Sequence, residues 1–275
     1  MTVETTNYYI GSNQPLHHSR FLWDMIAVSS TSVQAGDTGD ATLALNDYTH
    51  QRWVSSIDPT AEASFIIMEP GATVEVDMVF IAAHNLFTAG ATVKVWTAPE
   101  TAAPFTFTER ASVTPTDNGA IALLFNNFGV PHQIGAIKVG VDSGGASSPL
   151  SIGILRAGVA LQMYRPLGNT EPIGLRTEKT MRQRDSETGQ PLVRTVQRRR
   201  KSAGLAWPTL PSDWYRANFQ PFAETLPERP FGFVQNAVSM PESVVWGWTN
   251  DDPMPQTSGG KKNTDISMKI IGFDG

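Results

Sequence analysis

The feature that most constrains this chain is the stretch from Arg176 to Trp207, in which two polar arms of β-forming residues flank a turn. The turn is predicted at Asp185–Pro191, whose glycine and proline favour a reversal of the chain. Neither arm carries enough apolar side chains to bury both of its faces. The stretch therefore predicts a long hairpin that extends from a smaller core.

The charge of this stretch is also unusual. Nine of the chain's 21 lysines and arginines lie between Arg176 and Lys201, against three acidic residues. An isolated two-stranded ribbon is only marginally stable in water. We therefore expect neighbouring subunits to cover the hairpin, which predicts a protein that works within an assembly and is not an enzyme.

The first 165 residues have the pattern of an all-β domain. The segment 71–82 alternates polar and apolar residues and then becomes continuously apolar, as strands do when they enter a sandwich core. The segment 91–96 alternates with Val93 and Val95 on one face. Further strands are expected at 120–125, 134–141 and 150–161.

After residue 165 the pattern changes. Two prolines in the segment 163–172 mark a linker before the hairpin. The segment 211–226 predicts one short helix, capped by Ser212 or Asp213 and limited by Pro221. Three strands are expected at the end of the chain, over 229–235, 243–249 and 263–273.

The order of motifs in the first part resembles the discoidin or galactose-binding jelly roll. The motifs are Leu45–Trp53, Val79–Leu86, Gly90–Trp96 and a closing segment at Ile152–Leu161. Gln51-Arg52-Trp53 departs from the Thr-x-Trp of that family. The resemblance covers residues 1–165 and implies a jelly-roll β-sandwich there.

The second part resembles the ring-forming domain of tailed-phage tail-tube and distal-tail proteins. The resemblance covers residues 173–275 and consists of a long polar hairpin, a short aromatic helix and three strands in that order. It implies a mainly β fold in two domains, a jelly roll over 1–165 and a tail-tube-like β domain over 166–275 with its hairpin at 176–207.

Together the two resemblances imply a structural component of a phage tail tip or baseplate. Such a distal-tail-like protein forms a homo-oligomeric ring, a hexamer in that family, that links the tail tube to hub and tip proteins. It is assembled in the host cytoplasm and resides in the virion tail. The alternative is a carbohydrate-binding module for adsorption to a host-surface glycan.

The charge distribution supports contacts between copies of the chain. Residues 1–175 hold 7 basic and 15 acidic side chains, a net charge of −8, whereas residues 176–275 hold 14 and 11, a net charge of +3. Basic and acidic surfaces can meet across a subunit interface. The predicted interface residues are Arg182, Arg184, Arg194, Arg198, Arg199, Arg200, Lys201, Trp207 and Trp214. For the two tryptophans the alternative is a place in the core of a small domain that needs large side chains.

The basic run at 198–201 raises the question of nucleic-acid binding. Alternation along a strand sends its four cations to two different faces, and no aromatic residue interleaves the arm for base stacking. We therefore expect no sequence-specific contact with nucleic acid. A glycan in the jelly roll would meet His84, Asn85 and Trp96, which lie in or beside predicted loops.

The sequence gives little support for metal binding, for catalysis or for a membrane-spanning segment. The chain has no cysteine, and its five histidines lack the spacing of helix-borne zinc sites. Asp37 and Asp40 could bind calcium, but their glycine-rich surroundings favour a turn. Nucleophile-elbow, zinc-protease, phosphate-loop and dinucleotide motifs are missing, and no apolar run is long enough to span a membrane. We expect no cofactor and no metal.

Overall fold

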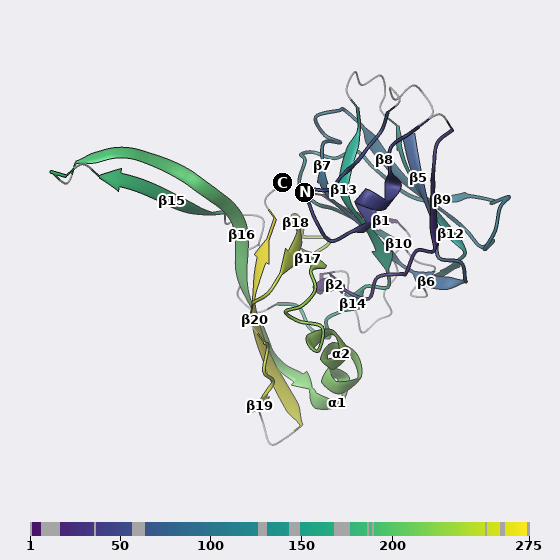
Figure 1. The fold of residues 1–275 in the computed structure, drawn as a ribbon. Helices are drawn as coiled ribbons and strands as arrows, with labels where there is room; N and C mark the ends of the chain where they lie inside the picture. Colours follow the sequence, from purple (N-terminus) through teal and green to yellow (C-terminus); the bar gives the residue numbers. More distant parts are fainter. Residues whose placement is uncertain are drawn as a thin grey trace.

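The fold was analysed in a computed structural model of the chain. It describes residues 2–6, 17–35, 37–56, 64–125, 131–142, 149–167, 177–185, 187–188, 190–250, 252–258 and 262–273. The protein is mainly β, with a sandwich formed by the first part of the chain and a third sheet formed largely by the last part (Figure 1). This confirms the predicted fold class.

Two five-stranded sheets make the jelly-roll sandwich. We call the first the central sheet, whose strands in spatial order are β1 (Thr2–Thr6), β10 (Ile121–Phe125), β7 (Met78–His84), β13 (Ser151–Gly158) and β4 (Trp53–Val54). We call the second the outer sheet, with β3 (Ser30–Val33), β5 (Ser64–Glu69), β12 (Ala136–Asp142), β8 (Thr92–Ala98) and β9 (Thr108–Val113). A small ribbon of β6 (Val74–Val76) and β11 (His132–Ile134) and the 3-10 helix η1 (Ala41–Leu45) complete this part.

The sandwich core lies between the two sheets. Val93 and Val95 of β8 are fully buried in it, as their alternation predicted, and they meet Ile121 and Leu123 of β10 in the same cluster. Trp53 of β4 is also completely buried there. The core therefore follows the period-two pattern of the strands.

The central sheet is covered on its other face as well. All seven residues of β7 are buried, because alternate side chains point into two different cores. Phe80 packs against Trp246 of the third sheet, with ring centroids 5.8 Å apart. A Cβ on Gly232 would lie 2.6 Å from the Phe80 ring, so glycine allows the close approach of these two layers. The three sheets form one packed body.

We call the third sheet the C-terminal sheet. Its order is β14 (Leu161–Gln162), β2 (Arg20–Leu22), β17 (Phe231–Asn236), β18 (Met240–Trp248), β20 (Asn263–Gly272), β16 (Pro191–Pro211) and β15 (Thr177–Asp185), and β19 (Gln256–Ser258) pairs with β20. Two of its strands, β2 and β14, come from the first 165 residues. Strand pairing thus crosses the residue 165/166 boundary, while the division into two domains stays a prediction. The linker predicted at 163–172 lies partly outside the described residues.

The predicted short helix follows β16. It consists of α1 (Ser212–Trp214), a π-helical turn η2 (Tyr215–Phe219) and α2 (Gln220–Ala223). Phe219 and Phe222 are fully buried against the C-terminal sheet. The predicted cap is wrong: Pro211 occupies that position without a side-chain hydrogen bond, and the Ser212 hydroxyl lies 3.0 Å from that of Thr264 on β20.

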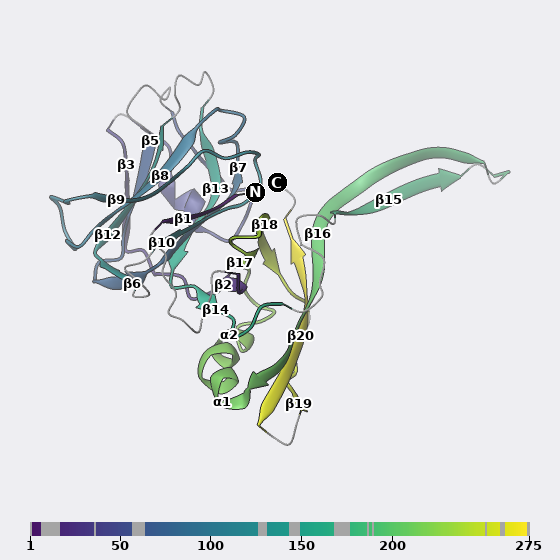
Figure 2. The same ribbon diagram turned by 180° about the vertical axis from the view of Figure 1, so that it is seen from behind.

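One element, the hairpin of β15 and β16, stands apart from the rest of the molecule. The hairpin of β15 and the first part of β16 projects away from the body, whereas α1 and α2 lie at the opposite end of the C-terminal sheet (Figures 1 and 2). In the part of the chain that the structure describes, no helix has the length and apolar character needed to cross a membrane.

Candidate functional site

The projecting hairpin is the most distinctive surface of the molecule. Its strands pair antiparallel from Thr177 opposite Lys201 to Asp185 opposite Pro191. Beyond Lys201, β16 continues into the body and pairs with β20 as far as Pro211. The predicted hairpin is therefore confirmed, but its second arm belongs to the body after residue 201. The ribbon is two-stranded as far as its base at Lys201, which also pairs with Gly272 of β20.

The ribbon's side chains differ between its two faces. Cross-strand partners lie on the same face, so Met181 and Val196 form an apolar pair on one side, 39% and 41% exposed. Lys179 lies opposite Arg199 on that side, and like charges in such positions are destabilising. Arg182 lies on the other face and is exposed. The face with Met181 and Val196 does not have the composition of a surface that contacts only water.

The base of the hairpin is held by Glu178. Its carboxylate accepts a hydrogen bond from Nε of Arg200 at 2.9 Å and another from the Ser202 hydroxyl, and it lies 3.8 Å from Nζ of Lys269. The hydrogen bonds from Ser202 and Arg200 lower the pKa of Glu178 below its ordinary value. Arg200 was predicted to face another subunit, yet it binds within its own chain.

Three further predicted interface residues contact the chain's own body. For two of them the predicted contact with another subunit is wrong. Trp207 is fully buried in the core beneath the helix, 5.8 Å from Phe21 between ring centroids. Lys201 is 6% exposed. Trp214 is half-buried and packs 5.9 Å from Tyr164. The interface prediction is wrong for Trp207 and Lys201, because β16 enters the body at Lys201 and both side chains are buried there.

The remaining predicted interface residues lie on the ribbon. Arg182, Arg184 and Arg199 are exposed. Arg194 and Arg198 belong to the paired strand β16, and their side chains lie outside the described part of the chain. The exposed cations of the ribbon thus remain candidates for contacts with another molecule.

The predicted glycan residues His84 and Asn85 have internal partners. Nε2 of His84 donates to the carbonyl of Gly119 at 2.7 Å, and Nδ1 accepts from the amide of Leu86 at 3.3 Å. Burial lowers the pKa of His84 to about 4, although the bond to Gly119 opposes this shift. His84 is therefore a neutral core residue, so its prediction as a sugar ligand is wrong.

Asn85 closes the end of the sandwich beside His84. Its Oδ1 accepts from the amide of Ser151 at 2.8 Å, and its Nδ2 donates to the carbonyl of Pro149 at 2.8 Å. Both ends of the side-chain amide are used to fasten the end of β7 to the start of β13. The side chain of Asn85 therefore has a structural role that requires no bound ligand.

Trp96 lies on β8 of the outer sheet, whereas His84 lies on β7 of the central sheet. It is half-buried on the outer face of β8, where Nζ of Lys138 lies 4.5 Å from its ring centroid. The same Nζ lies 5.0 Å from the ring of Phe65 and 5.4 Å from that of Phe107. Because Trp96 and His84 belong to opposite sheets, the three predicted glycan residues do not form one site.

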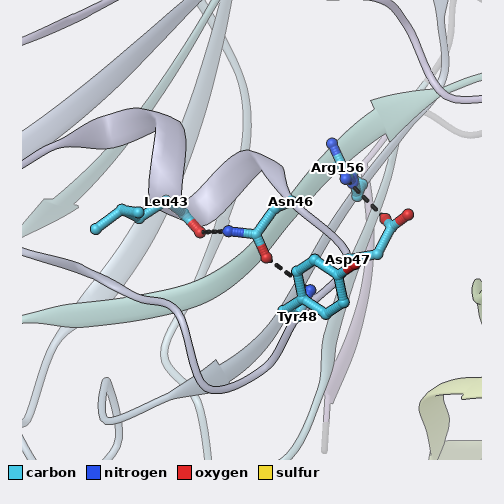
Figure 3. Close-up of polar contacts among 5 residues, drawn as sticks. All are labelled: Leu43, Asn46, Asp47, Tyr48 and Arg156. Atoms are coloured by element: carbon cyan, nitrogen blue, oxygen red, sulfur yellow. Dashed lines mark hydrogen bonds and ion pairs between the residues drawn. The ribbon is translucent and has the colours of Figure 1, made fainter.

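A polar cluster that the sequence analysis did not predict lies between η1 and β13 (Figure 3). Arg156 donates from a terminal guanidinium nitrogen to Oδ1 of Asp47 at 2.7 Å. Asn46 shapes the turn before Asp47, since it donates to the carbonyl of Leu43 and accepts from the amide of Tyr48. Arg156 appears in the sequence as the single charged residue of an apolar strand, which is the signal that could have indicated it.

Beside this cluster is a cavity of about 470 Å³, lined by residues 26–31, Thr42, Leu45 and Arg156. The Arg156 Nε is buried without a hydrogen-bond partner among the described residues. Tyr48, the residue after Asp47, is 60% exposed, and its ring centroid lies 5.7 Å from that of His50. Of these groups Arg156 lines the cavity, together with the hydroxyls of Ser29, Ser30, Thr31 and Thr42, and such polar groups can hold a polar small molecule.

The loop with Asp37 and Asp40 proves to be a hydrogen-bonded turn. Oδ1 of Asp37 accepts from the amides of Gly39 and Ser56, and Asp40 accepts from the amide of Thr42 at the start of η1. Within the described ranges, no three acidic or histidine side chains lie close enough to hold a metal ion. The turn prediction accounts for both carboxylates.

Comparison with known proteins gives similarities to solved structures alone, since no family model and no curated protein matches this chain. Chitosan-binding module 1 of a chitosanase/glucanase from Paenibacillus sp. IK-5 matches 50% of this chain and 100% of its own, with 15% identity and a TM-score of 0.41. The family 32 carbohydrate-binding module of Clostridium perfringens NanJ, solved with galactose, matches 46% and 91%, with 17% identity and a TM-score of 0.37. The module of AlyQ, solved with 4,5-unsaturated mannuronic acid, matches 49% and 98%, with 16% identity and a TM-score of 0.37. The sugars named are those of these proteins.

Proposed function

We propose that this protein is a structural subunit that oligomerises through its projecting hairpin. The observation that carries the proposal is the two-stranded ribbon from Thr177 to Lys201, which extends beyond the body of the chain (Figures 1 and 2). Beyond its base, both edges of the ribbon are open among the described strands, because β15 ends the sheet and β16 pairs with β15 alone until Lys201, which also pairs with Gly272 of β20.

The physical argument rests on the cost of leaving such a ribbon in water. Open strand edges promote association with other chains, and isolated ribbons are marginally stable. Here the exposed pair Met181 and Val196 adds apolar surface, and the opposed cations Lys179 and Arg199 add repulsion. A neighbouring subunit that covers the ribbon would remove the apolar surface from water and could place acidic side chains beside Lys179 and Arg199.

The order of elements along the chain supports a more specific proposal about the kind of assembly. A long hairpin, a short helix with buried aromatic residues and antiparallel strands occur in the order found in distal-tail and tail-tube proteins of tailed phages. We propose a ring, hexameric by that resemblance, in a phage tail tip or baseplate. Its partners are further tail proteins, its site of action is the virion, and its role is not enzymatic.

The test is to shorten the hairpin without disturbing the body. Met181 and Val196 are direct cross-strand partners, so residues 182–195 can be replaced by Asn-Gly, which favours a two-residue hairpin turn. We expect the wild-type chain to form a closed oligomer and the shortened chain to be a folded monomer in size-exclusion chromatography with light scattering. A cooperative thermal unfolding transition of the shortened chain serves as the folding control, since dissociation alone lowers the unfolding temperature. A monomeric wild type, or an intact oligomer after shortening, would reject the proposal.

A second candidate function is carbohydrate binding by the sandwich. It is favoured by the cavity of about 470 Å³ beside Arg156, whose buried Nε lacks a partner among the described residues. The test is a glycan array with wild type, Arg156→Ala and Trp96→Ala. Binding lost in Arg156→Ala alone would locate the site at this cavity, binding lost in Trp96→Ala alone would locate it on the outer sheet, and a blank wild-type array would remove the candidate.

A further inference from the structure

A groove lies at the end of the C-terminal sheet that is opposite the hairpin. Its volume is about 530 Å³, and it runs between the helical segment and the loop before β19. Tyr215 and Leu226 line it from the helical side, and Pro253 and Met254 line it from the loop. Met254 is 73% exposed, a large apolar side chain left in water at the edge of the groove. Exposed apolar surface beside a groove is typical of binding sites.

The groove is also acidic. Glu224 and Asp252 are exposed and belong to its lining. Tyr215 is 8% exposed, and its pKa is raised first by burial and then by the charges of Asp252 and Glu224. Both carboxylates therefore act on the same hydroxyl from within the groove. A long cationic side chain, which has an apolar stem and a charged end, matches this combination of apolar walls and carboxylates.

The hairpin carries such side chains at its far end. Arg182 and Arg184 are exposed, and as residues two apart on β15 they point to the same face of the ribbon. They lie close to the end of β15 at Asp185, beside the turn of the hairpin. The helix α2, whose residues help to line the groove, lies at the other end of the sheet (Figures 1 and 2). Two complementary surfaces at opposite ends of a subunit produce head-to-tail contacts, which close into a ring when the rotation between subunits permits.

We propose that the groove between the helical segment and the 252–255 loop receives Arg182 and Arg184 from the hairpin of a neighbouring copy of this chain. The inference rests on the proposed oligomeric function and specifies the surface that the hairpin binds. Glu224 and Asp252 pair with the two guanidinium groups, and the apolar walls cover the side-chain stems. Every subunit thus donates one hairpin and accepts one.

The experiment uses two charge-reversed forms of the full chain. In the first, R182E/R184E, the hairpin presents two carboxylates to the acidic groove, and in the second, E224K/D252K, the groove presents two ammonium groups to the basic hairpin. We expect each form alone to raise the apparent Kd for self-association at least about tenfold, because like charges then face each other. An equimolar mixture is expected to recover assembly, since each hairpin again meets a groove of opposite charge. Light scattering measures the molar mass in each case.

Arg216→Glu is the matched control, because Arg216 is an exposed cation on the same helical segment and is not part of the groove lining. Its assembly should equal that of wild type. If R182E/R184E dissociates the oligomer but E224K/D252K does not, or if the mixture fails to recover, the hairpin binds elsewhere and this inference is overturned while the proposed function stands. If shortening the hairpin leaves the oligomer intact, the proposed function itself fails.

Discussion

Because the imidazole of His84 is buried in its neutral form, we expect the folded protein to lose stability in mild acid. The imidazole is 4% exposed, and it donates from Nε2 to Gly119 while it accepts at Nδ1, so the folded protein holds the neutral form. Burial lowers its pKa from the ordinary 6.5 to about 4. Between these two values the unfolded chain binds a proton that the folded chain does not bind. Lowering the pH through this interval therefore favours unfolding.

The magnitude follows from the two pKa values. A shift from 6.5 to about 4 corresponds to a maximum of about 3 kcal/mol, reached when the pH falls below the folded value. Between pH 7 and pH 5 the same values give a loss of about 2 kcal/mol from this residue alone. Above about pH 7.5 the contribution is constant, because His84 is then neutral in both states.

The assay is urea unfolding of wild type and His84→Gln at pH 7 and pH 5. Gln can still donate to the Gly119 carbonyl but does not titrate. At pH 7 we expect the substitution to cost about 1–3 kcal/mol, as for a disturbed buried hydrogen bond. Burial also lowers the pKa of His18 and of His132, so wild type loses further stability in acid. The difference between the two proteins isolates His84, and an equal loss in both would refute the reasoning.

The remaining predictions concern packing and are checked by chemical denaturation. Trp207 and Trp246 are almost completely buried in different cores, so replacing either by alanine should cost about 3–5 kcal/mol. In Gly272→Ala the new Cβ would lie 1.9 Å from Cγ2 of Val245, and we expect a loss of about 1–3 kcal/mol. Gly204→Ala is its control, because no atom lies within 4 Å of that Cβ and the change should stay within about 0.5 kcal/mol.

Local patterns were sufficient to predict the helix and many of the strands, but not β3 or β9. The alternation at Val93 and Val95 gave the correct buried face, and the polar arms around residues 185–191 gave the hairpin. The aromatic residues of segment 211–226 gave the helix that covers the C-terminal sheet. Each of these features depends on residues close together in sequence, so period and turn chemistry are enough to indicate them.

Contacts between distant segments could not be predicted in this way. Strand β2 pairs with β17 across more than 200 residues, and nothing in the three residues Arg20–Leu22 indicates that partner. His84 looked like a loop residue because its acceptor, the Gly119 carbonyl, comes from another part of the chain. The candidate pair of Asp47 and Arg156 was missed for the same reason, since its members are brought together only by the closed sandwich.

The strand β16 explains why the hairpin and the groove can act as a matched pair. It is 21 residues long, which corresponds to at most about 70 Å in an extended strand. Its first part forms the ribbon, its second part pairs with β20, and its last residue precedes the helical segment that lines the groove. Both proposed contact surfaces are thus attached to one continuous strand, whose inner part is fixed in the packed sheet. A subunit whose donor and acceptor surfaces keep a constant separation imposes the same geometry on every contact, which is the requirement for a closed ring.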